Sequence, residues 1–200
     1  MSNGFSVPGM STDEATQVRE RLQQRLTALM DAELTLKHIH WNVVGPNFIG
    51  VHEMLDPQVD AVREMVDDLA ERIATLGGSP IGTPGHIVAT RTWDDYDLLR
   101  GSTSEHLGAL DIVYSGIIAD HRDAIAETEE PDPVSQDMLI EQSGQLEQFQ
   151  WFVRAHLEDS SGNLSTTGAT GEREAADAAA KAAADPAAKA GRASKARKAS

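Results

Sequence analysis

The chain of 200 residues contains no cysteine, few aromatic residues and no long apolar run. Without cysteine it forms no disulfide and offers no thiolate ligand, which excludes iron–sulfur clusters and cysteine-based zinc sites. Its apolar stretches are too short to cross a bilayer, and the first ten residues lack the basic and apolar segments of a secretory signal. We therefore expect a cytoplasmic protein with no membrane partner.

Positive charge is scarce and unevenly distributed. The chain carries 17 Lys and Arg against 32 Asp and Glu; residues 1–171 have a net charge of −18, whereas residues 172–200 have +3. The end of the chain is rich in Ala, Lys and Arg and has no large apolar residue, so it buries too little surface to offset its ordering entropy. We expect a flexible basic tail at 162–200, a flexible N-terminal segment at 1–14 and one domain at 15–161.

Apolar side chains recur at intervals of three and four through most of this domain, which is the pattern of amphipathic helices. A first series starts at Val18, and a second runs from Val59 to Leu76 and ends at Gly77-Gly78, as helices commonly do. A third helix is expected at about 103–128 and a fourth at about 134–158. No alternating pattern typical of β-strands competes with these helices.

A Gly- and Pro-rich crossover joins the second and third of these helices and is expected to carry a short helical turn near 95–100. Four long helices with one long connection predict an all-α fold, a ferritin-like four-helix bundle.

Nitrogen and oxygen ligands gather where the first and second predicted helices meet. His40 lies near the end of the first helix, His52 and Asp56 near the start of the second, and Asp67 and Glu71 further along it. The acids alone would indicate a solvated acidic face, but histidines beside them do not fit that interpretation. Imidazole and carboxylate groups suit ferrous iron, manganese or zinc, so the residues predict a metal site.

One chain cannot close this site by itself. Eleven residues separate Asp56 from Asp67, about 16 Å along a helix, whereas metal ligands approach to about 2 Å. A two-fold pairing of antiparallel helices would bring the first half-site of one subunit against the second half-site of its partner. The sequence therefore predicts a homo-oligomer built from dimers.

The stretch from His40 to His52, followed by Asp56 and by Asp-x-x-x-Glu-Arg at 67–72, resembles the signature of the Dps proteins, miniferritins that protect DNA in starved bacteria. The resemblance implies a hollow shell of twelve subunits that oxidises iron with hydrogen peroxide, two ferrous ions per inter-subunit site, and stores ferric oxide. It also implies that His40, His52 and Asp56 come from one subunit and Asp67 and Glu71 from the other.

The same resemblance implies an ion channel and a DNA-binding segment. Asp137 and Glu141 would line the channel, with the loop at 127–132 as its outer funnel, although an acidic helix start that complements the macrodipole explains them equally well. The tail would bind double-stranded DNA without sequence preference and associate the shell with the nucleoid. The basic residues of this segment are Lys181, Lys189, Arg192, Lys195, Arg197 and Lys198.

Other classes of protein remain to be weighed. A conventional ferritin carries its di-iron centre on Glu-x-x-His pairs, and this sequence has none. A purely architectural nucleoid protein is favoured by the basic tail but not by the complete ligand set. A bundle that binds zinc or manganese without redox chemistry stays open.

Overall fold

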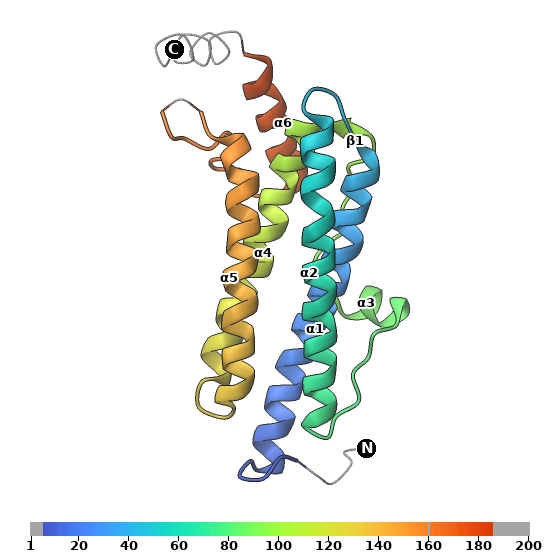
Figure 1. Cartoon of the computed structure of the whole chain (residues 1–200), viewed down its shortest axis with the longest axis vertical. Coiled ribbons are helices and arrows are strands. Elements are labelled where there is room, and N and C mark those ends of the chain that lie inside the picture. Colours follow the sequence, from blue (N-terminus) through green and yellow to red (C-terminus); the bar gives the residue numbers. More distant parts are fainter. Residues whose placement is uncertain (1–5, 160, 186–200) are drawn as a thin grey trace.

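The computed structural model describes residues 6–159 and 161–185. Four long helices run along its long axis: α1 (Thr12–Asn42), α2 (Phe48–Thr75), α4 (Thr103–Thr128) and α5 (Pro133–Leu157) (Figure 1). Helix α1 packs against α2, and α4 packs against α5. The predicted ferritin-like bundle is confirmed. Within the described ranges, no helix has the length and apolar character needed to span a membrane.

Reciprocal hydrogen bonds define where α1 and α4 begin. The Glu14 amide donates to Ser11 Oγ at 3.2 Å, and the Ser11 amide donates to Glu14 Oε2 at 2.8 Å. Ser102 and Glu105 form the same capping box at the start of α4. Because the box satisfies amides that a helix start leaves free, α1 begins inside the segment at 1–14 that was expected to be flexible.

A short pair of strands connects two of the long helices at one end of the bundle. Strand β1 (Val43–Val44) pairs in parallel with β2 (Gly101–Ser102), which ties the end of α1 to the start of α4.

The short crossover helix is α3 (Pro84–Thr90) and not the turn expected near 95–100. Pro84 in its first turn favours a helix start, whereas residues 95–100 are held in irregular structure, with His38 Nε2 donating to the Leu98 carbonyl at 2.7 Å.

The core follows the predicted apolar series. Most leucines of α1 and both leucines of α2 are fully buried, and in the middle of the bundle Tyr114 donates to Gln58 Oε1 at 2.6 Å. Pro57 lies inside α2 and does not interrupt it. The acidic residues of α2 are exposed on the opposite side, as the sequence predicted; these are Asp60, Glu64, Asp67 and Glu71.

The segment expected to be a flexible tail contains a sixth helix, α6 (Glu172–Ala184), which packs on α4 (Figure 1). Its contact uses small side chains: Ala175, Ala176 and Ala179 are buried, and a Cβ at Gly108 would lie 2.5 Å from the Ala175 carbonyl oxygen. Alanine has the highest helix propensity and loses no side-chain entropy, so this helix docks without large apolar residues. The expectation of a flexible 162–200 segment is therefore wrong for α6.

Candidate metal centre

His40 and His52 form the centre of the predicted site. His40 lies in the last turn of α1 and His52 in the second turn of α2, and their rings are stacked with centroids 3.6 Å apart. The chain turns back sharply between them, with Gly45 and Asn47 both at positive φ. Glycine tolerates this conformation and asparagine adopts it more readily than most residues, so the local sequence brings the two imidazoles together.

Each histidine is held by the backbone of the other. His40 Nδ1 donates to the His52 carbonyl at 3.0 Å, and His52 Nδ1 donates to the His40 carbonyl at 2.9 Å. A donor at Nδ1 fixes the neutral tautomer that has its lone pair on Nε2. This is the arrangement in which metal-ligating histidines are usually oriented, so both rings fit a metal through Nε2.

Asp56 joins the pair from the next turn of α2. Its Oδ1 lies 3.3 Å from His40 Nδ1 and accepts a hydrogen bond from Lys37 Nζ at 2.9 Å. The Lys37 hydrogen bond is the main reason that the pKa of the Asp56 carboxyl is lowered, and the nearby histidines contribute. Asp56 is therefore available as a carboxylate ligand, in competition with Lys37. The sequence pattern did not reveal Lys37, although it lies one helical turn before His40.

Asp67 and Glu71 are exposed on α2 and lie further along the helix, about 16 Å and about 22 Å from Asp56 along its axis. Among the described residues, no group of three or more His, Asp or Glu is arranged to hold a metal ion. A single chain brings His40, His52 and Asp56 near one another without forming a complete metal site, and it leaves the two acids apart.

The acids assigned to a channel are both exposed on α5, and Asp132 just before them is not. Asp132 is 3% exposed and accepts two hydrogen bonds from Arg72, at 2.9 and 2.7 Å. A carboxylate paired in this way is closed to a passing cation, so the expected outer funnel at 127–132 is wrong at Asp132. The exposure of Asp137 and Glu141 is compatible with a channel lining and equally with an ordinary acidic helix start.

Most of the basic residues assigned to DNA lie outside the described residues. Lys181 is the exception, and it is exposed in the last turn of α6. The others are Lys189, Arg192, Lys195, Arg197 and Lys198.

Fold and site define a ferritin-like protein, and the chain matches the model of the ferritin-like domain over residues 19–162. It is 57% identical over 175 residues to the DNA protection during starvation protein of Mycolicibacterium smegmatis, covering 88% of this chain and 96% of that protein. The chain belongs to the Dps family.

Solved structures agree with this assignment. A structure of Mycobacterium smegmatis Dps in a tetragonal form has a TM-score of 0.80 at 58% identity, covering 81% of this chain and 98% of that one. DpsA14 from Streptomyces coelicolor has a TM-score of 0.80 at 55% identity, covering 82% and 98%.

Proposed function

We propose that the protein is a peroxide-dependent ferroxidase and iron store, active as a homo-oligomer of dimers, that binds and protects DNA in the cytoplasm. The observation that carries the proposal is the stacked His40–His52 pair beside Asp56, with Asp67 and Glu71 separated from it on the same helix. The separation calls for a second chain, and the family supports an assembly of twelve.

The exposed side of α1 fits a partner subunit. Leu34 is 63% exposed and Trp41 is 71% exposed, and they lie seven residues apart, two turns along one helix face. Large apolar side chains grouped on one face commonly mark an interface. Antiparallel pairing along this face would place each histidine pair against the partner's two acids.

The ligand types suit oxidation of bound ferrous ions, which are the substrate. Imidazole nitrogens bind ferrous iron well, and the carboxylates of Asp56, Asp67 and Glu71 favour the higher charge of ferric iron. With two ferrous ions at the site, hydrogen peroxide accepts one electron from each, its O–O bond breaks, and two hydroxide ions form. No hydroxyl radical is released, and the ferric product hydrolyses and collects in the cavity.

Iron would reach the interior through a path lined by Asp137 and Glu141, because exposed carboxylates concentrate cations near a pore. DNA would be bound by Lys181 and the basic residues beyond it, through phosphate contacts that carry no sequence information.

Subunit mixing tests the shared site. Chains with Asp67→Ala and Glu71→Ala, and chains with His40→Ala and His52→Ala, should each oxidise iron slowly. Mixed dimers of the two should regain activity, because one of their two sites has all its ligands. Inactive mixed dimers, verified by mass, would contradict a site shared in this way.

Peroxide stoichiometry separates the ferroxidase from its alternatives. Consumption of one peroxide per two ferrous ions, without trapped radicals, is expected of the intact protein. A passive nucleoid scaffold or a non-redox metal bundle would leave the ratio and the radical yield at those of free iron in buffer.

A further inference from the structure

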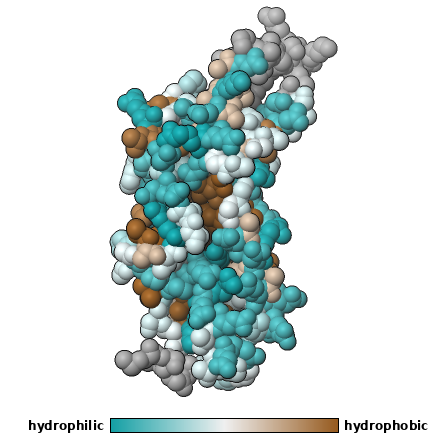
Figure 2. All heavy atoms as spheres, turned by 180° about the vertical axis from the view of Figure 1, so that it is seen from behind, coloured by the Kyte–Doolittle hydropathy of each residue, from teal (hydrophilic) through white to brown (hydrophobic). Residues whose placement is uncertain are grey.

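A cavity of about 290 Å³ opens between α1 and α4 and shares no residue with the candidate metal centre. Its walls come from the middle of both helices, from crossover residues 92–96 and from Glu172 at the start of α6. Figure 2 shows the face of the molecule that carries α1 and α4, with apolar atoms recessed among hydrophilic ones. The cavity therefore combines an apolar floor with a polar rim.

Two of the carboxylates in this cavity are already paired. Asp31 accepts hydrogen bonds from Arg91 Nη1 at 3.1 Å and from Trp93 Nε1 at 2.7 Å. Asp120 accepts one from Arg25 at 3.1 Å, and its side chain remains 50% exposed. Both carboxylates already have an arginine as counter-charge, although the half-exposed Asp120 can still bind a second cation.

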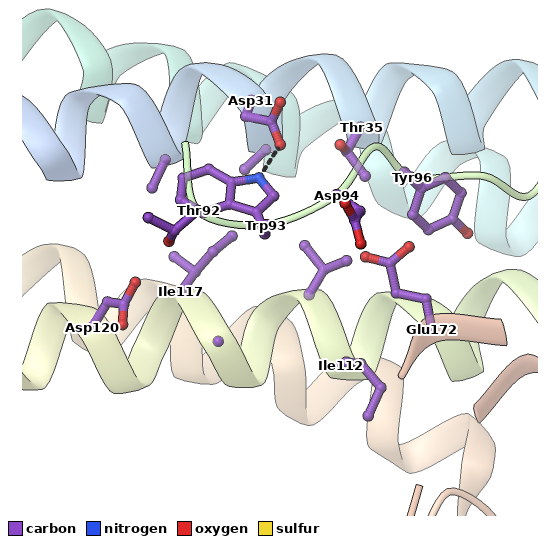
Figure 3. A pocket seen from close by; sticks show the side chains of 14 residues that line it. Asp31, Thr35, Thr92, Trp93, Asp94, Tyr96, Ile112, Ile117, Asp120 and Glu172 are labelled. Atoms are coloured by element: carbon purple, nitrogen blue, oxygen red, sulfur yellow. Dashed lines mark hydrogen bonds between the residues drawn. The ribbon is translucent and has the colours of Figure 1, made fainter. Parts of the chain in front are cut away.

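The other two carboxylates lack a counter-charge. Figure 3 shows Asp94 from the crossover and Glu172 from α6 with their carboxylates facing each other. Within the described ranges, neither has a hydrogen bond or an ion pair. Two anionic groups that face each other in a hollow repel, and a cation between them would remove that cost.

The hydroxyl of a largely buried threonine faces the same position. Thr35 is only 8% exposed and projects from α1 into the cavity above Asp94 (Figure 3). In the described part of the chain its hydroxyl has no hydrogen-bond partner. The hydroxyl oxygen is therefore free to accept a hydrogen bond from a ligand in the cavity.

The electrostatics of Glu172 agree with this interpretation. Burial, together with the nearby carboxylates of Asp97, Asp31 and Asp94, raises the pKa of Glu172 to about 7. Two arginines of this region already have carboxylate partners, since Arg91 binds Asp31 and Asp95 and Arg173 binds Asp97. The acids that act on Glu172 come from α1 and the crossover and are Asp97, Asp31 and Asp94, whereas Asp120 of α4 lies at the other end of the cavity (Figure 3).

We propose that the cavity binds a linear aliphatic polyamine, one of whose primary ammonium groups sits among Asp94, Glu172 and Thr35. An ammonium has three N–H donors, and this position offers two carboxylates and one hydroxyl oxygen. A divalent metal fits less well, because within the described residues these carboxylates do not form a metal-binding group.

The apolar wall of the cavity suits the methylene chain of a polyamine. Between Glu172 and Asp120 the wall includes the Trp93 ring and Ile117 of α4 (Figure 3), and Val113 also lines the cavity; these apolar groups can cover methylene groups. Ile112 and Asp120 are eight residues apart on one helix, about 12 Å. Asp120 can thus hold a second ammonium, at a separation that a linear triamine reaches and a four-carbon diamine does not.

Calorimetric titration of the intact protein with spermidine at low ionic strength and pH 8 tests the proposal. We expect saturable binding at one site per chain, weakened about tenfold or more by Glu172→Gln or Asp94→Asn and several-fold by Thr35→Val. 1,4-Diaminobutane should bind more weakly. Affinity should rise with pH through about 7, because the ammonium needs the ionised form of Glu172.

Asp177→Asn is the matched control, since it removes the same charge from the exposed side of α6. This variant should bind spermidine with the same affinity as the parent protein. Glu172→Gln removes a half-buried charge and should keep α6 docked, which circular dichroism and size measurement can verify. Equal losses in Asp177→Asn and Glu172→Gln, or displacement by magnesium at equal ionic strength, would mean general counter-ion screening and would overturn the proposal.

Discussion

Arg72 holds both carboxylate oxygens of Asp132, and its Nε donates to Ser135 Oγ at 3.0 Å. The Ser135 hydroxyl in turn donates to Asp132. Arg72 directly follows Glu71, so this network fixes the acidic half-site of α2 to the start of α5. Both contacts with the carboxylate come from Nη2, and they are strong because donor and acceptor are both charged.

Arg72→Gln should destabilise the protein by about 3–5 kcal/mol, because it leaves the buried Asp132 carboxylate without its partner. The measurement is denaturation by urea. Arg63→Gln is the control, since its pair with Glu33 is more exposed and should be worth less than about 1 kcal/mol. Similar small losses in both variants would mean that Asp132 is not dependent on Arg72.

Lys37→Gln should increase the affinity of the histidine half-site for ferrous iron by a few-fold. In the parent, Lys37 holds the Asp56 oxygen that a metal would use. Removing the ammonium frees the carboxylate, although it also raises the pKa of Asp56 towards its ordinary value. Iron titration near neutral pH measures the effect, with Arg63→Gln as a charge-matched control; an unchanged or weaker affinity would show that Lys37 does not compete.

His121 should make the protein sensitive to acid. Burial, with Arg25 nearby, lowers the pKa of this histidine from 6.5 to about 4. Its contribution to stability is present above pH 6.5 and is lost as pH falls towards 4, by up to about 3 kcal/mol. His121→Leu should therefore flatten the pH dependence of urea denaturation between about pH 7 and 4.5, whereas the exposed-site variant His156→Gln should keep the slope of the parent.

DNA binding should be lost when residues 186–200 are removed, while iron oxidation persists. Those residues contain five Lys and Arg, and in a multi-subunit shell the tails would engage many phosphates together. Gel-shift titrations across a salt series compare the full chain, a truncation after Asp185 and one after Gly171. If the first truncation binds as the full chain does but the second does not, α6 and not the end of the chain carries the contact.

The sequence predicted the bundle because heptad-like spacing reports which helix face is buried, and it predicted the separation of Asp56 from Asp67 because helix rise is constant. These are local rules. The same rules place Leu34 and Trp41 of α1 outside the stripe that one core needs, which agrees with their exposure.

Features that depend on distant segments were missed. Lys37 reaches Asp56 across the α1–α2 hairpin, and Arg72 buries Asp132 from a different helix. The docking of α6 depends on Gly108, 64 residues before its first residue Glu172, where the missing side chain allows the two backbones to approach. No periodic pattern in one segment reports such contacts.

Glu172 is both a wall of the cavity and the first residue of the helix from which the basic end of the chain departs. Its raised pKa means that its proton is bound more tightly when α6 is docked. Thermodynamic reciprocity then requires that protonation of Glu172 strengthens the docking of α6, and that ionisation near neutral pH weakens it. The point from which the basic end of the chain departs is therefore itself adjustable by small changes in pH near neutrality.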